Sequence, residues 1–161
     1  MQIAVVGASQ PRPESLALAE AVGRELARRG IVLVCGGGTG VMEAACRGAK
    51  SAGGTTVGIL PGDNPSDANA YVDIVICTGM GYGRNSLVVK SGGAVIAIDG
   101  AYGTLTEIGH ALGEKIPVIG LNTWSLVKEG AEDKGIERAT DPVDAVERAV
   151  AAARRREAMP R

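Results

Sequence analysis

The chain has 161 residues, enough for one domain with a buried core, and 45% of them are hydrophobic while 22% are charged. Its formal net charge of −1 provides no general attraction to nucleic acid or to an anionic membrane surface, so we expect neither as a partner. No apolar run approaches the ~20 residues that cross a bilayer, and no signal-peptide pattern precedes the first apolar run, which predicts a cytoplasmic protein.

Short apolar runs alternate with longer amphipathic stretches along the whole chain. The runs predict strands at 2–7, 31–35, 55–60, 73–77, 94–98 and 117–121, with a weaker one at 136–139. The amphipathic stretches predict helices at 14–29, 39–52, 83–91, 103–114 and 142–156. This alternation is typical of an α/β, Rossmann-like three-layer sandwich, with helices on both faces of a mostly parallel sheet of six or seven strands. We expect a single nucleotide- or phosphate-binding domain over 1–161.

The residue types of the core follow from what the chain lacks. It contains 24 glycines, three tyrosines, one tryptophan and no phenylalanine. The core must therefore be built from Val, Ile, Leu and Ala, which suits parallel strands that helices cover on both faces. Three cysteines without a C-x-x-C spacing, Cys35, Cys46 and Cys77, are expected to be small buried hydrophobes.

Ligands of open parallel sheets bind beyond the carboxyl ends of the strands, so the turns that follow the strands are the candidate binding segments. The first turn begins at Gly7 and offers backbone N–H groups together with the hydroxyl of Ser9 to a phosphate. The polar stretch 61–71, after the third strand, is long enough to cover a site.

The second turn carries four glycines in five positions, Gly36, Gly37, Gly38, Thr39 and Gly40. Glycines let the backbone approach a ligand closely, and the N–H groups at the following helix start favour an anion. The run lacks the Gly-Lys-Ser/Thr ending of a P-loop and does not match G-x-G-x-x-G, because residue 41 is valine. We predict ligand contact here, against the alternative of a turn that needs only steric freedom.

The third turn, 78–85, contains Gly81, Gly83, Arg84 and Asn85. A cation at a helix start is unfavourable by the helix dipole, so Arg84 is expected to pair with a carboxylate or an anionic ligand. Its forked donors match a phosphate or carboxylate group. These four residues are predicted to bind the ligand.

The fourth turn follows the fifth strand and contains Gly100, Gly103 and Thr104, all predicted phosphate binders. Thr104-x-x-Glu107 also has the spacing of a capping box, so two interpretations of Glu107 stand side by side: a helix cap, or a carboxylate placed in the site. The lone His110 lies on the same helical face as Glu107, but a single histidine without a cluster is an ordinary helix residue, and we predict no metal.

The second, third and fourth turns, in this order, resemble the LOG (Lonely Guy) superfamily, often labelled "possible lysine decarboxylase", over roughly residues 1–122. The segment Gly36 to Glu43 resembles its first glycine motif, and Arg84 matches the arginine of its Arg-Lys pair. Gly100, Gly103, Thr104 and Glu107 match its Pro-Gly-Gly-x-Gly-Thr-x-x-Glu motif. Asn85 stands in place of the family's lysine, Asp99 in place of its proline and Ala101 in place of a glycine. The Arg-Asn pair resembles the branch that includes molybdenum cofactor carrier proteins.

Two functions are implied by the resemblance. The carrier branch implies a binding protein, carrier or sensor, for a small phosphorylated nucleotide-like or molybdopterin-like ligand. The LOG enzymes imply a nucleoside 5′-monophosphate phosphoribohydrolase that releases the free base and ribose 5-phosphate, with Arg84 and Glu107 as the catalytic pair, so enzymatic activity stays open.

The resemblance also implies a homo-oligomer, a dimer or tetramer, to which the apolar stretch Leu87-Val88-Val89 can contribute. No lysine follows a strand beside a glycine turn, so we expect no pyridoxal phosphate and no lysine decarboxylase activity. No cofactor is required by either function, although the molybdenum cofactor or a nucleotide is a candidate ligand.

Overall fold

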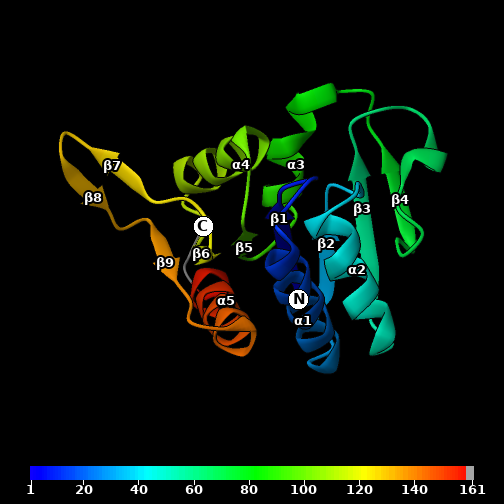
Figure 1. Ribbon diagram of the computed structural model, residues 1–161, viewed down its shortest axis with the longest axis horizontal. Coiled ribbons are helices and arrows are strands. Elements are labelled where there is room, and N and C mark those ends of the chain that lie inside the picture. The colour runs from blue at the N-terminus through cyan, green and yellow to red at the C-terminus, as the bar shows by residue number, and fades with distance from the viewer. Residues whose placement is uncertain (159–161) are drawn as a thin grey trace.

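The computed structural model describes residues 1–158, and its centre is a seven-stranded sheet in which every neighbouring pair is parallel (Figure 1). The strands lie in the order β4-β3-β2-β1-β5-β6-β9. Their bounds are β1 (Gln2–Gly7), β2 (Val32–Cys35), β3 (Thr56–Leu60), β4 (Ile74–Cys77), β5 (Val95–Ile98), β6 (Val118–Leu121) and β9 (Ile136–Arg138). The strand order changes direction between β1 and β5, which makes this the switch point of the sheet.

Helices cover both faces of the sheet, as predicted. The helices α1 (Pro13–Arg28), α2 (Val41–Ser51) and α5 (Pro142–Glu157) lie on one face, whereas α3 (Asn85–Lys90) and α4 (Tyr102–Gly113) lie on the other (Figure 1). Side chains of a strand alternate between the two faces, so Ile3 and Val5 of β1 belong to the first core while Ala4 and Val6 belong to the second. The three-layer sandwich is confirmed.

Two predicted helix starts lie a few residues too early, for a backbone reason. Gly40 precedes α2 with φ +69° and ψ −125°, a conformation outside the helical region that glycine adopts readily. The segment Gly81–Arg84 forms a separate helical turn before α3 begins at Asn85.

A hairpin that was not predicted from the sequence lies between β6 and β9. The strands β7 (Leu126–Lys128) and β8 (Ala131–Asp133) pair antiparallel and project from the body of the molecule (Figure 1). They are joined by Glu129 and Gly130, which both have positive φ, as a tight hairpin turn requires. Strands of three largely exposed residues lack the apolar run that marked the buried strands.

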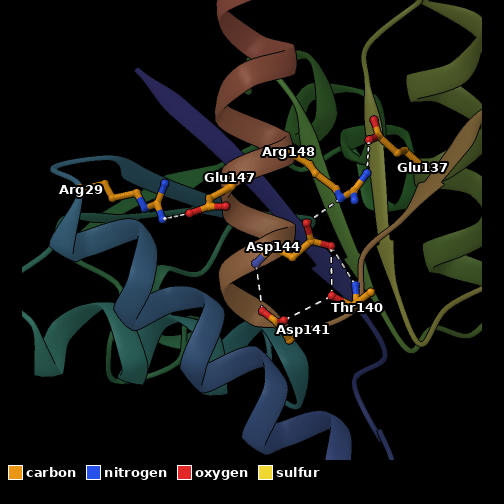
Figure 2. Close-up of polar contacts among 7 residues, drawn as sticks. All are labelled: Arg29, Glu137, Thr140, Asp141, Asp144, Glu147 and Arg148. Atoms are coloured by element: carbon orange, nitrogen blue, oxygen red, sulfur yellow. Dashed lines mark hydrogen bonds and ion pairs between the residues drawn. The ribbon is translucent and has the colours of Figure 1, made fainter.

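The start of α5 is capped by side chains (Figure 2). The carboxylate of Asp141 accepts a hydrogen bond from the backbone N–H of Asp144 at 2.9 Å, and Pro142 occupies the first helical turn. Thr140 donates its own N–H to the carboxylate of Asp144 at 2.9 Å. The first bond satisfies a donor that a helix start leaves without an intrahelical partner, and the second ties the residue before the cap to the first turn.

Ion pairs then connect α5 to both of its neighbours (Figure 2). Arg148 donates from Nε to Asp144 at 2.7 Å and from Nη1 to Glu137 of β9 at 2.6 Å. Across the other side of α5, Arg29 donates to Glu147 at 3.3 Å. These partly exposed pairs fix the orientation of α5 over the edge of the sheet.

Two predictions about individual side chains are wrong. Val88 and Val89 are fully buried in the second core, because α3 turns them onto the sheet, so of the stretch Leu87-Val88-Val89 only Leu87 reaches the surface. Cys77 is exposed on the edge strand β4, whereas Cys35 and Cys46 are buried as expected. Among residues 1–158, no helix has the length and apolar character needed to cross a membrane.

Candidate functional site

A cavity of about 270 Å³ lies at the carboxyl edge of the sheet, where residues that follow β1 and β5 meet. This is the switch point, at which ligands of open α/β sheets bind. Its lining comes from the turn after β1 (Gly7, Ala8, Ser9), from α2 (Met42), from the turn before α3 and its first residue (Tyr82, Arg84, Asn85), and from α4 and the residue before it (Ala101, Gly103, Thr104, Glu107).

The glycine turn after β2 packs on the first turn instead of lining the cavity. The N–H of Val41 donates to Ala8 O at 3.0 Å, and the hydroxyl of Thr39 donates to Ser9 O at 3.3 Å. A Cβ on Gly40 would collide with the backbone carbonyls of Ala8 and Ser9, and φ is +69°. Glycine is therefore needed here to let two backbone segments touch.

Gly36 has a different task, because it makes room for the Arg84 side chain. A Cβ on Gly36 would lie 2.7 Å from Arg84 Nη2, and the Gly36 carbonyl accepts a hydrogen bond from that nitrogen at 3.3 Å. The glycine thus positions a cavity-lining cation without lining the cavity itself.

The predicted polar loop 61–71 braces this turn and contributes no residue to the cavity lining among the described residues. Asn69 donates its backbone N–H to Gly37 O at 2.9 Å and its side-chain amide to Gly38 O at 2.8 Å. Gly37 meanwhile packs against Leu60 and Gly58. Nothing in the sequence around Asn69 indicated this role, because the contact joins segments that are about thirty residues apart.

Arg84 is held by a chain of hydrogen bonds that joins α3 to α4. Its Nη1 donates to the side-chain oxygen of Asn85, the Asn85 amide donates to Thr106 Oγ1 at 3.0 Å, and Thr106 donates to Gly103 O at 2.7 Å. Asn85 and Arg84 are both largely buried. Within the described part of the chain, the buried Arg84 Nε has no hydrogen-bond partner. Two of the five N–H donors of the guanidinium are used within the described residues, by Asn85 and Gly36, so three remain for a ligand, the Nε–H among them.

Glu107 is the second buried charged side chain of the cavity. Its Oε1 lies 3.9 Å from Arg84 Nη1, and burial raises its pKa to about 7, while the positive charge of Arg84 acts in the opposite direction. The helix α4 is preceded by Ala101 and has no side-chain cap, so the capping-box interpretation is wrong. The helix α4 begins at Tyr102, two residues before Thr104. Glu107 therefore lies in its second turn, on the buried side of the helix.

Asp99 does not add negative charge to the cavity. Its carboxylate accepts hydrogen bonds from Ser15 Oγ at 2.8 Å, from the N–H of Arg12 at 3.1 Å and from the N–H of Gly100 at 2.8 Å. Partial burial acts to raise the pKa of Asp99, but these hydrogen bonds, with the Arg12 guanidinium, lower it overall. Asp99 therefore stabilises the start of α1.

The structure brings together half of the residues predicted from the turns. Those that line the cavity are Gly7, Ser9, Arg84, Asn85, Gly103, Thr104 and Glu107. Those outside its lining are Gly36, Gly37, Gly38, Thr39, Gly40, Gly81, Gly83 and Gly100.

Four cavity residues were missed. Ala8, Tyr82 and Ala101 stand inside the predicted turns and could have been found there, whereas Met42 stands in the segment Gly36 to Glu43 but is an apolar helix residue that was not predicted to bind. In residues 1–158, no group of three or more His, Cys, Asp or Glu side chains is arranged to hold a metal ion.

The fold and the cavity define an α/β protein with a small, partly buried site at the switch point of a parallel sheet. The chain belongs to the SLOG cluster4 family, whose model matches residues 1–148. The resemblance to the LOG superfamily that the three turns predicted is confirmed by this match and by the relatives that follow.

Two curated relatives and two solved structures frame the family. An uncharacterized protein of Archaeoglobus fulgidus is 46% identical over 71% of this chain and 75% of its own length. A cytokinin riboside 5′-monophosphate phosphoribohydrolase of Mycobacterium marinum is 33% identical over 83% and 67%. The molybdenum cofactor binding protein of Rippkaea orientalis superposes with a TM-score of 0.84 at 35% identity, covering 93% and 95%. For the Moco carrier protein of Chlamydomonas reinhardtii the TM-score is 0.82 at 32% identity, covering 96% and 98%.

Proposed function

We propose that this chain is a binding protein, of carrier or sensor type, for a small phosphorylated ligand that is nucleotide-like or molybdopterin-like. The observation that carries the proposal is the buried guanidinium of Arg84, which lines the cavity with its Nε donor unused by residues 1–158. A buried donor without a partner costs about 1–3 kcal/mol, and a phosphate oxygen is a partner that would offset this cost.

The surroundings of Arg84 support an anion as that partner. The cavity lies between the turn after β1 and the start of α4, and helix starts present free N–H groups with a partial positive charge. Thr104 adds a hydroxyl in the first turn of α4. The two solved structures of molybdenum cofactor binding and carrier proteins support a ligand of this kind.

Calorimetric titration with AMP and with a molybdopterin-type ligand tests the proposal. We expect saturable binding of at least one of them, and a loss of tenfold to hundredfold in affinity for Arg84→Met, because a hydrogen bond to a charged group contributes roughly 1.5–3 kcal/mol. Arg148→Met, which removes a partly exposed arginine of α5, is the matched control and should bind as the wild type does. The proposal fails if neither ligand binds, or if both variants bind equally well.

The alternative function, a nucleoside 5′-monophosphate phosphoribohydrolase, is favoured by one observation of its own. Glu107 lies 3.9 Å from Arg84 and has a pKa of about 7, so that near neutral pH it is available in both its acid and its base form. As an acid it would donate a proton to the departing base. As a carboxylate it would stabilise the oxocarbenium-like transition state of N-glycosidic cleavage. The phosphoribohydrolase among the relatives supports this reading.

The alternative is tested by incubating the protein with AMP and measuring the released free adenine by chromatography. The enzyme hypothesis predicts release above the blank and a loss of at least a hundredfold for Glu107→Gln, which retains the shape of the side chain and removes its proton transfer. Release that survives this substitution, or no release at all, removes the hypothesis and leaves the binding function.

We further propose that the chain self-associates through the edge of the sheet at β4. Ile74 and Ile76 of this edge strand and Leu87 of α3 are exposed large hydrophobic side chains, and an uncovered edge strand favours pairing. Light scattering of the wild type and of an Ile76→Lys variant tests this, with a shift of the variant toward monomer expected. The cytoplasmic location stays a prediction, as does the single domain, whose residues 159–161 lie outside the described part.

A further inference from the structure

Two of the few aromatic side chains of this protein meet beside the cavity. Tyr102 is the first residue of α4, and Trp124 follows β6. Their ring centroids are 5.9 Å apart, with 37° between the planes. Tyr102 remains 78% exposed, so the contact does not bury it in the core. Trp124 is partly buried and packs against the second core, so the exposed ring of Tyr102 rests on an indole that the core holds in place.

A second cavity, of about 290 Å³, adjoins this pair. It is lined by Arg12, Asp99, Gly100, Asn122, Thr123 and Trp124, and we call it the aromatic cleft. The two cavities share the turn after β5, because Gly100 lines the aromatic cleft and its neighbour Ala101 lines the main cavity. Both cavities thus open at the same edge of the sheet, on either side of the turn after β5.

The polar groups of the aromatic cleft favour a ring that accepts hydrogen bonds. The carboxylate of Asp99 already accepts three hydrogen bonds from this chain, so most of its acceptor capacity is used. Arg12 presents a largely exposed guanidinium 3.5 Å from that carboxylate. Trp124 Nε1 is buried without an acceptor in the described chain, so packing against the second core and Tyr102, and no hydrogen bond, holds the indole.

The sizes of the two cavities point to a shared ligand. At about 270 and 290 Å³, each lies below the roughly 300–1,000 Å³ of sites that hold a whole small molecule. A nucleotide-like compound has two parts of different chemistry, an anionic phosphate and a flat ring. Arg84 suits the first part and the face of Trp124 suits the second, since any heteroaromatic base offers a π-face for stacking.

We propose that the aromatic cleft is the subsite for the planar heteroaromatic ring of a two-part ligand whose phosphate occupies the main cavity. The proposal rests on the proposed function for the phosphate, but the ring subsite is a separate site with separate residues. Trp124 supplies the stacking surface, Tyr102 packs against Trp124 from outside the lining, and Arg12 supplies donors at the rim.

Trp124 is the sole tryptophan, so its fluorescence emission reports directly on the aromatic cleft. The probes are AMP, adenosine, which has the ring without the phosphate, and ribose 5-phosphate, which has the phosphate without the ring. We expect saturable changes in Trp124 emission with AMP and, at higher concentration, with adenosine. Ribose 5-phosphate should bind by calorimetry and leave the emission unchanged.

Variants of two exposed tyrosines separate the aromatic cleft from the main cavity. Tyr102→Ala should weaken AMP binding at least fivefold and leave ribose 5-phosphate binding as it was, because the ring that packs against Trp124 is lost. Tyr82→Ala removes a ring of similar exposure from the lining of the main cavity, and at saturating AMP it should still show the emission response. Arg148→Met, which lies outside the linings of both cavities, is the matched control and should bind AMP as the wild type does.

The outcomes distinguish the two proposals. Unchanged Trp124 emission with both AMP and adenosine overturns the ring subsite. The proposed function would still stand in that case if ribose 5-phosphate binds to the wild type and Arg84→Met abolishes this binding. A loss of the emission response in Tyr82→Ala but not in Tyr102→Ala also overturns the subsite, because it places the ring in the main cavity. A response to adenosine without any binding of ribose 5-phosphate supports the cleft and counts against the phosphate site.

Discussion

Charged side chains around α5 and around the main cavity are arranged in opposite ways. At α5, Arg148 is shared between Asp144 and Glu137 at 2.7 and 2.6 Å, and both acids lie at the surface (Figure 2). In the cavity, Arg84 and Glu107 are buried, 3.9 Å apart, and Arg84 Nε has no partner within residues 1–158. The first group is exposed and satisfied, whereas the second is buried and incompletely satisfied.

The difference indicates where the structure leaves hydrogen-bond donors unpaired and therefore able to bind a ligand. Exposed ion pairs contribute about 0–1 kcal/mol each to stability, so the α5 network stabilises local orientation and little else. Buried polar groups without partners cost about 1–3 kcal/mol, and a fold retains them where something else compensates. A bound anion would supply that compensation at Arg84, which is why substitutions in the two regions should have different effects on binding and on stability.

The largest effect is expected from Glu107→Gln, through the pH dependence of stability. The folded chain holds this proton up to a pKa of about 7, whereas the ordinary value is 4.5. The full contribution is present below pH 4.5, and the free energy of unfolding falls as pH rises to 7, by on the order of 3 kcal/mol. Urea denaturation at pH 4.5 and pH 8 should show this fall in the wild type and its loss in Glu107→Gln. An equal fall in both proteins would contradict the burial of this carboxyl.

The next effect is a loss of binding without a loss of stability. Gly36→Ala places a methyl group 2.7 Å from Arg84 Nη2, closer than atoms in contact can lie, so the guanidinium must shift, and we expect affinity for AMP to fall about tenfold. The free energy of unfolding should change by less than about 1 kcal/mol, since a flexible side chain can move. Gly109→Ala, an open position on α4, is the control and should bind AMP normally. If both variants bind AMP as the wild type does, Gly36 has no role in positioning Arg84 for the ligand.

A smaller effect, confined to stability, is expected at the other region. Asp141→Ala removes the side-chain cap of α5 and should lower the free energy of unfolding by about 1 kcal/mol, or Tm by about 2–4 °C. Calorimetric affinity for AMP should remain that of the wild type. A clear loss of AMP affinity in Asp141→Ala would contradict the expectation that the α5 region affects stability and not binding.

The smallest change is expected for Arg148→Met, despite its two short ion pairs. Surface pairs of this kind contribute about 0–1 kcal/mol, so chemical denaturation should show a shift within that range. Raising the salt concentration should reduce the difference from the wild type further, because exposed charges are screened. A loss of several kcal/mol would mean that the α5 network is more than a surface feature.

The fold was largely predictable because its signals are local. Apolar runs marked the seven strands of the main sheet, and the Asp141-Pro142 pair marked the start of α5. The strand order was not predictable, since register depends on contacts between distant segments. The hairpin of β7 and β8 also escaped, because its short exposed strands bury almost nothing.

The site was predictable only in part, for a related reason. Turn composition located Arg84, Glu107 and the cavity-lining glycines Gly7 and Gly103. It did not distinguish glycines that touch a ligand from glycines such as Gly40, which let two backbone segments touch. The role of Asp99 likewise depends on α1, about eighty-four residues earlier in the chain.

The most direct test of the account follows the Arg84 Nε–H itself. In ¹⁵N nuclear magnetic resonance spectra of arginine side chains, that signal can be assigned by its absence in Arg84→Met. We predict that AMP shifts it saturably, with the Kd found by calorimetry, while the Arg148 signal stays in place. A bound ligand that leaves the Arg84 signal unmoved, or that moves the Arg148 signal instead, would contradict the account.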